Sequence, residues 1–185
     1  GMCGENDGIE TLLTELEDFK GWDAKIFQGS MADFAHLPTP VDAVILALGN
    51  SGDRSAVPQL VELTGKLDTA VTLSHHRSLA LALEKLADKN AAKPLAKLLQ
   101  KDGMHGFAMH HLQDALTQLD NDGKGPNPVR NSSYDKRTKA LREIVLARAL
   151  YRCGDYNNVA NNILENYTRD LRGLFALHAQ SVLEK

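Results

Sequence analysis

The sequence predicts an all-α protein, a right-handed α-α superhelix of about nine helices arranged in antiparallel pairs. The main observation is an internal repeat, in which Leu, Asp, Ala, Leu and Leu within residues 48–63 recur within residues 83–98 at a shift of 35 residues. A fixed period of this length is typical of a solenoid of helix pairs. The composition agrees, because 43% of the residues are hydrophobic but only 5% are aromatic, which favours closely packed aliphatic helices.

Residues 9–19 predict an amphipathic first helix. Its apolar side consists of Ile9, Leu12, Leu13, Leu16 and Phe19, and its acidic residues fall mostly outside that stripe. A polar outer face is what the end of a solenoid requires, although an ordinary solvated helix has the same pattern. We expect residues 1–8 to be disordered or an expression remnant, and residues 30–36 to form a short helix that ends at the prolines of residues 38–40.

The first repeat has a well-marked helix start. Thr39 suits the N-cap, Pro40 suits the first helical position, and Asp42 lies near the positive end of the helix dipole. Apolar residues then follow at three- and four-residue spacings: Val41, Val44, Ile45 and Leu48. The glycines of residues 49–52 indicate a tight turn, and residues 57–63 supply the buried side of a second helix.

The second repeat follows the same plan over residues 79–99, with Asn90 expected as the cap of its second helix. The pattern Leu-Gly-x-x-Gly-Asp-x-x-Ala-Val-Pro-x-Leu at residues 48–60 resembles a HEAT-like repeat of the phycobilin-lyase type. In the second copy, Glu84 and Ala87 stand in place of the two turn glycines. The resemblance implies a stack of helix pairs. It implies no particular activity, since HEAT repeats serve scaffolds, adaptors and a few enzymes.

The second half of the chain continues the helical pattern around one interruption. Residues 104–119 predict a long fifth helix, and residues 121–135 predict a long loop rich in Gly, Pro, Asn and Ser. A loop of this length is either functional or a mobile insertion. Helical character returns at about residue 136, residues 150–155 repeat the Leu, Gly and Asp of the first turn, and residues 171–182 form a last helix. We expect residues 1–185 to form a single domain.

Composition excludes several classes of protein. The net charge of −3 and the pI near 6.2 argue against a broad nucleic-acid or anionic-membrane surface. No apolar run approaches the roughly 18 residues that a membrane span needs, and two cysteines do not make a disulfide framework. The chain contains no H-E-x-x-H, P-loop, C-x-x-C or G-x-S-x-G motif, so we predict neither an enzyme nor a bound cofactor. No signal peptide is visible, and the compartment is either cytoplasmic or periplasmic.

The seven histidines offer weak candidates for a metal site. His110 and Asp114 are i,i+4 neighbours on the predicted fifth helix, within a cluster at residues 105–114. A site would also need a partner from a neighbouring helix, such as His75 or His76. We favour the alternative, in which these histidines are structural or simply exposed, and we predict no metal.

The leading interpretation is a non-catalytic protein-interaction or structural scaffold module. Its partner would be a protein, which could be another domain of the same parent polypeptide. Arg130, Tyr134 and Arg137 accompany the long loop and are the candidates for contact with an acidic partner surface or a carboxylate. A solvated basic stretch would have the same composition.

A second resemblance concerns residues 127–183. The stretches Asn-Pro-Val-Arg-Asn-Ser-Ser-Tyr at 127–134 and Arg-Glu-Ile-Val-Leu-Ala-Arg-Ala-Leu-Tyr-Arg-Cys-Gly-Asp at 142–155 look like the helical tail of some bacterial FAD-dependent oxidoreductases. This resemblance implies an accessory domain of such an enzyme. The flavin domain itself is not expected here, because no G-x-G-x-x-G follows a strand pattern.

Overall fold

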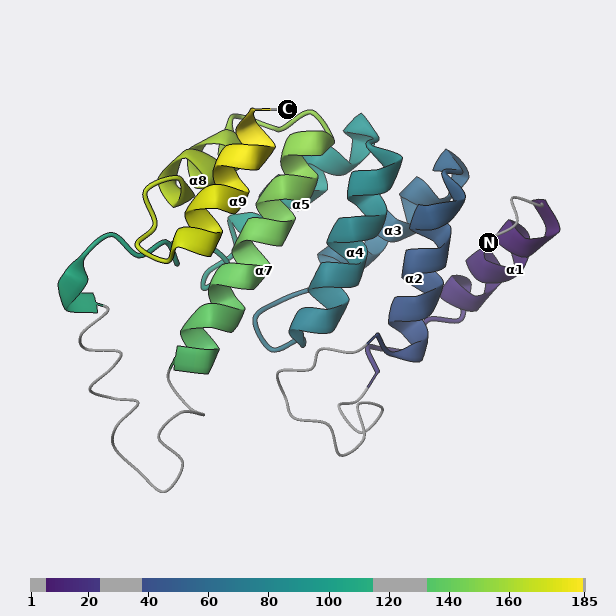
Figure 1. Ribbon diagram of the computed structural model, residues 1–185. Coiled ribbons are helices and arrows are strands. Elements are labelled where there is room, and N and C mark those ends of the chain that lie inside the picture. The colour runs from purple at the N-terminus through teal and green to yellow at the C-terminus, as the bar shows by residue number, and fades with distance from the viewer. Residues whose placement is uncertain (1–5, 24–37, 115–132, 185) are drawn as a thin grey trace, which may run out of the picture.

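The computed structural model describes residues 6–23, 38–114 and 133–184 (Figure 1). Within these ranges residues 112–114 are helical, no residue forms a strand, and the chain forms eight α-helices and two short 3-10 helices with described bounds. They are α1 (Asn6–Glu17), α2 (Pro40–Ser51), η2 (Arg54–Ala56), α3 (Val57–Gly65), α4 (Leu73–Leu86), η3 (Lys89–Ala91), α5 (Ala92–Leu99), α7 (Ser133–Arg152), α8 (Val159–Tyr167) and α9 (Gly173–Leu183). The predicted all-α fold is therefore confirmed.

The helices are arranged in two layers. Figure 1 shows α2, α4, α7 and α9 side by side in one layer, with α3, α5 and α8 behind them. The pairs α2–α3, α4–α5 and α7–α8 each connect the two layers through a tight turn, and α1 packs against α2 and α3 at one end. This arrangement confirms the predicted stack of helix pairs.

Short polar side chains set the helix starts in each repeat. Thr39 and Asp42 form a capping box on α2: the amide of Asp42 donates to Thr39 Oγ1 over 3.3 Å, and the amide of Thr39 donates to Asp42 Oδ2 over 3.1 Å. In the next turns, Asp53 and Asp88 each accept a backbone N–H two residues later, over 2.8 Å. Asp88 caps the 3-10 helix η3, which includes Asn90, and α5 itself has Ala91 at its N-cap with no side-chain cap, so the prediction of Asn90 as the cap was wrong.

The core is aliphatic and lies between the two layers. Its largest fully buried side chains include Ile45, Leu48, Leu60, Leu79, Leu83, Leu95, Leu98 and Leu146. Removing one such side chain from water contributes roughly 1.5–3 kcal/mol. Gly49, expected to be a turn residue, lies within α2 instead, where a Cβ would come within 2.4 Å of Ala82 Cα on α4. That glycine therefore allows α2 and α4 to pack closely.

The predicted fifth helix is wrong over residues 104–111, which are not helical. Gly103 and Gly106 take positive φ angles of 69° and 89°, which interrupt a helix. The backbone of Met109 then pairs with the turn between α8 and α9: its amide donates to Asp170 Oδ2 over 2.9 Å, and its carbonyl accepts the amide of Leu171 over 2.8 Å. These bonds occupy groups that a helix would have used internally.

Several other predicted boundaries differ from the structure. Residues 6–8, expected to be disordered, belong to α1, and α7 begins at Ser133, inside the predicted loop of residues 121–135. Residues 1–5, the predicted short helix at 30–36 and most of that loop lie outside the described residues.

Candidate functional site

An apolar groove of about 480 Å³ lies between α7 and α9. Its lining consists of Arg137, Leu141, Ile144 and Val145 from α7, and Arg172, Gly173, Leu174, Phe175 and His178 from α9 and the turn before it. Aliphatic and aromatic side chains form the walls, whereas the polar groups are two guanidiniums and an imidazole. None of these described lining residues is acidic. The groove is thus apolar in its body and basic at its edges.

The outer face of α9 extends the apolar surface beyond the groove. Leu174 is 79% exposed and Leu177 is 65% exposed, and Leu171 in the preceding turn is 52% exposed. Single exposed leucines need no explanation, but Leu174 also lines the groove and Leu177 lies one turn further along α9, so the exposed apolar surface adjoins the groove. Such patches mark surfaces that another molecule covers.

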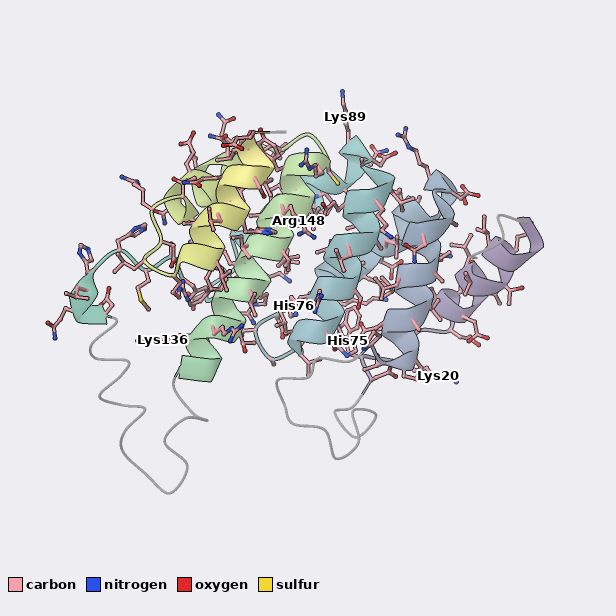
Figure 2. The ribbon with its side chains drawn as sticks, in the orientation of Figure 1. Lys20, His75, His76, Lys89, Lys136 and Arg148 are labelled. Atoms are coloured by element: carbon pink, nitrogen blue, oxygen red, sulfur yellow. The ribbon has the colours of Figure 1, made fainter. Side chains whose placement is uncertain are left out.

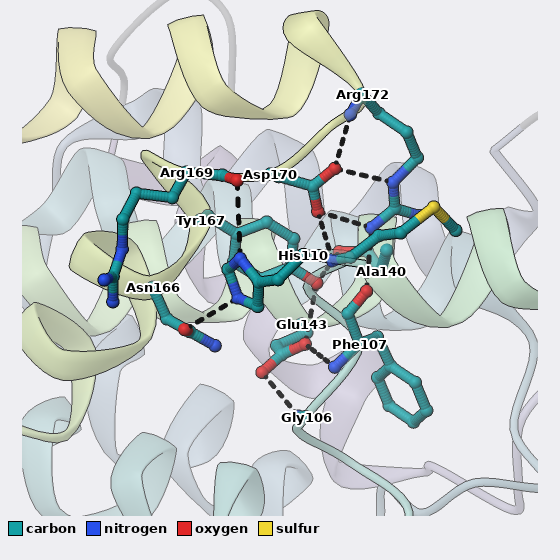
Figure 3. Close-up of polar contacts among 11 residues, drawn as sticks. Gly106, Phe107, His110, Ala140, Glu143, Asn166, Tyr167, Arg169, Asp170 and Arg172 are labelled. Carbon is teal, nitrogen blue, oxygen red and sulfur yellow. Dashed lines mark hydrogen bonds and ion pairs between the residues drawn. The ribbon is translucent and has the colours of Figure 1, made fainter. Parts of the chain in front are cut away.

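A buried ion pair fixes the turn that forms one end of the groove. Arg172 Nη2 lies 2.6 Å from Asp170 Oδ2, and the side chain of Asp170 is fully buried (Figure 3). Burial would raise the pKa of Asp170, but the hydrogen bonds from Arg172 and from the amide of Met109 outweigh burial and hold that pKa below its ordinary value. Asp170 is therefore a carboxylate, and it holds Arg172 at the groove edge.

The guanidinium of Arg172 is held on two further sides. Its Nη2 donates to the carbonyl of Phe107 over 2.7 Å, and its central carbon lies 4.4 Å from the ring centroid of Phe175. The second contact is a cation–π interaction with a residue of the groove wall. Arg172 is thus a rigid part of the site, and its charge is already compensated by Asp170.

Glu143 on α7 anchors the non-helical residues 104–111 (the extended segment) against α8. Its carboxylate accepts the amides of Gly106 and Phe107 over 2.8 and 2.9 Å, and it accepts the hydroxyl of Tyr167 over 2.7 Å (Figure 3). Tyr167 is fully buried, and burial, followed by the charge of Glu143, raises its pKa far above the usual range. The hydroxyl therefore stays protonated and donates.

The proposed metal ligands do not come together. His110 lies in the extended segment, with its Nε2 2.9 Å from Asn166 Oδ1 and its Nδ1 3.3 Å from the carbonyl of Arg169, while Asp114 is exposed. Because residues 104–111 are not helical, His110 and Asp114 share no helix face. The described residues contain no group of three or more His, Cys, Asp or Glu side chains placed to hold a metal ion.

The two adjacent histidines of α4 point into different surroundings (Figure 2). His76 is fully buried, with its Nδ1 2.9 Å from the carbonyl of Thr72. Burial lowers the pKa of His76 to about 4, so its imidazole is neutral at pH 7. Its Nε2 has no hydrogen-bond partner in the described part of the chain. His76 is therefore a buried residue of the core.

His75 forms a buried pair with Asp42 of α2. Its Nδ1 lies 2.9 Å from Asp42 Oδ1, its Nε2 lies 3.3 Å from the carbonyl of Asp23, and the ring of Trp22 stacks on it at 4.8 Å. Burial would lower the pKa of His75, but the hydrogen bond and charge of Asp42 raise it above the ordinary value. For Asp42, burial is likewise outweighed, and the pKa is lowered. Both ring nitrogens are occupied, so this pair joins elements and has no free catalytic group.

Of the residues predicted to contact a partner, Arg137 lines the groove. Arg130 lies outside the described residues, and Tyr134 lies in the first turn of α7, where its side chain is not described. The sequence pattern did not point to Arg172, and it did not distinguish the exposed leucines of the last helix from buried ones. One signal was present: α9 carries apolar residues all around its circumference, which is unusual for a helix at the surface.

The two layers of paired helices define a helical-repeat module. Residues 42–65, which cover α2 and α3, match the family model of the PBS lyase HEAT-like repeat, and this confirms the resemblance noted in the sequence. No curated protein and no solved structure matches the chain. The resemblance of residues 127–183 to the tail of flavin-dependent oxidoreductases therefore gains no support.

None of the helices in the described ranges is long and apolar enough to cross a membrane.

Proposed function

We propose that this chain is a non-catalytic protein-interaction module, and that the groove between α7 and α9 is the surface that binds its partner. The observation that carries the proposal is the continuity of the groove with the exposed face of α9, where Leu174 and Leu177 leave most of their surface in water. The partner is a separate protein or another domain of the same parent polypeptide. HEAT-like repeats present extended surfaces suited to such binding.

The energetics favour a protein partner. Covering an exposed leucine removes apolar surface from water and contributes roughly 1–2 kcal/mol. The walls of the groove and the outer face of α9 offer several such side chains in one patch. An open groove of this kind is the usual receptor for a helical segment, which inserts its apolar side chains and leaves its polar face in water.

The chemistry of the lining supports a non-catalytic role. His178 is the one imidazole among the described lining residues, and burial, followed by the guanidinium of Arg148, lowers its pKa. No carboxylate, thiol or hydroxyl from the described residues lines the groove beside it. A general base needs a nucleophile or a complementary acid beside it, and the described lining residues supply neither.

A peptide-display selection against the purified chain tests the proposal. Selected peptides should bind the double variant Leu174→Glu/Leu177→Glu at least about tenfold more weakly, because two buried leucines are replaced by carboxylates. The matched control is Leu112→Glu, since Leu112 is 68% exposed and does not line the groove. Peptides that bind both variants as well as the parent chain, or a selection that yields no specific binder, would contradict the proposal.

A further inference from the structure

We infer that the occupant of the groove is an acidic amphipathic helix, whose apolar face covers the groove and α9 and whose carboxylates meet the N-terminal turns of α7. This inference rests on the proposed function and narrows it to one class of partner.

The basic charge at the groove is not compensated within the described residues. The other two arginines nearby have acidic partners, because Arg172 pairs with Asp170 at 2.6 Å and Arg148 pairs with Glu84 at 2.7 Å. Arg137 is exposed, lines the groove, and has no acidic partner in the described part of the chain. Lys136 precedes it on α7 and is also exposed (Figure 2). A carboxylate on the occupant would supply the missing partner.

These cations do not serve the stability of α7 itself. The N-terminal end of a helix carries a partial positive charge, which favours acidic side chains and disfavours basic ones. Lys136 and Arg137 nevertheless occupy the fourth and fifth positions of α7, at the end of its first turn and the start of its second. The partial charge of the helix start therefore adds to the charge of these two cations, against one acidic residue, Asp135, in the first turn. An anionic group is favoured there by both contributions.

The apolar rows fit a helix better than an extended peptide or a small molecule. Leu141, Ile144 and Val145 recur at three- and four-residue spacings on α7. Leu174, Phe175 and His178 line the groove from α9 at the same spacings. Two such rows form ridges with a furrow between them, and a third helix packs its own i, i+3, i+4 side chains into that furrow. A small apolar molecule would fill the furrow but leave the outer face of α9 uncovered.

Three fluorescent peptides of about four helical turns provide the test. All have the same Leu and Ala pattern on one face, and their other face carries Glu in the first peptide, Gln in the second and Lys in the third. Fluorescence anisotropy at low ionic strength should show that the Glu peptide binds roughly two- to fivefold more tightly than the Gln peptide, with the Lys peptide weakest. The difference should shrink as salt is added.

Two variants test whether Arg137 causes the preference for the Glu peptide. Arg137→Glu should reverse the order, so that the Lys peptide binds more tightly than the Glu peptide. The control Lys97→Glu makes the same charge change at an exposed position on α5 that does not line the groove, and it should preserve the original order. Because both substitutions are at exposed positions, circular dichroism should show the parent helix content for each.

The outcomes separate the inference from the proposed function. Equal binding of the three peptides, or an unchanged order in Arg137→Glu, would contradict the inference that the occupant is an acidic helix. The peptide selection could still support the proposed interaction module. Failure of all three peptides to bind at millimolar concentration would overturn it as well. Tighter binding of the Lys peptide to the parent chain would assign the groove to a basic partner instead.

Discussion

Asp42 on α2 performs two structural tasks at once, because it caps its own helix through Thr39 and accepts a hydrogen bond from His75 on α4 over 2.9 Å. Both members of the Asp42–His75 pair are buried. Trp22 stacks on the imidazole and donates its Nε1 hydrogen to the carbonyl of Lys66 over 3.0 Å. One carboxylate therefore connects the N-terminal segment, α2 and α4.

Removing that carboxylate should destabilise the protein severely. We expect Asp42→Ala to lower the free energy of unfolding by about 3–5 kcal/mol, since it leaves a buried imidazole without its partner and removes the capping box. Urea unfolding followed by circular dichroism measures the effect. Asp53→Ala is the control, because Asp53 also caps a helix but has no buried histidine to satisfy, and it should cost less. Equal losses in the two variants would show that only capping matters.

His76 predicts a loss of stability in mild acid. Its folded pKa is lowered to about 4, whereas the unfolded value is 6.5, so the unfolded chain binds more protons between these two values. The contribution of the neutral imidazole is therefore complete above pH 6.5 and disappears as the pH falls towards 4, with a total of roughly 3 kcal/mol. Unfolding free energies between pH 4 and pH 7 measure this slope. The slope of the unfolding free energy against pH should be clearly shallower in His76→Leu. An unchanged slope would show that other titratable groups cause it.

Gly49 predicts a steric limit on the contact between α2 and α4. Gly49→Ala places a Cβ 2.4 Å from the backbone of Ala82, so the helices must separate. We expect a loss of at least about 2 kcal/mol, as for other overpacked cores. Gly65→Ala is the matched control, since Gly65 ends α3 with no atom within 4 Å of the added Cβ, and it should be neutral or slightly stabilising. Thermal unfolding of the two variants should therefore shift in opposite directions or differ by several degrees.

The hydrogen bonds of Glu143 should stabilise the extended segment. In Glu143→Gln the amide group brings its own N–H donors towards donors from Gly106, Phe107 and Tyr167. We expect a loss of about 2–3 kcal/mol and faster hydrogen exchange at the amides of Gly106 and Phe107. Exchange measured by NMR reports on both amides. Glu165→Gln, an exposed change on α8, should alter neither.

The repeats were predictable because their signals are local. Thr39 and Pro40 act within a few residues of their own position, so the sequence reveals them directly. The fate of residues 104–111 was not predictable in this way. Their apolar spacing suggested a helix, but the acceptors that satisfy their amides are Glu143 and Asp170, at sequence separations of 36 to 61 residues. Long-range hydrogen bonds of this kind override local periodicity.

The candidate site was only partly predictable for the same reason. Arg137 was recognised from its position beside the predicted loop, and it does line the groove. Arg172 was not recognised, because its placement depends on the carbonyl of Phe107, which only the fold brings close. The exposed leucines of α9 could not be separated from buried ones by spacing, since the helix is apolar all around.

The extended segment has a consequence for how the protein unfolds. In most helical-repeat arrays each unit contacts only its neighbours, so terminal units fray independently of the rest. Here the backbone of Met109 bonds to the turn between α8 and α9, and Glu143 on α7 holds the amides just before it. Opening the C-terminal helices therefore breaks hydrogen bonds to residues that directly follow α5. The last third of the array should melt as one cooperative block, without stepwise fraying from the end.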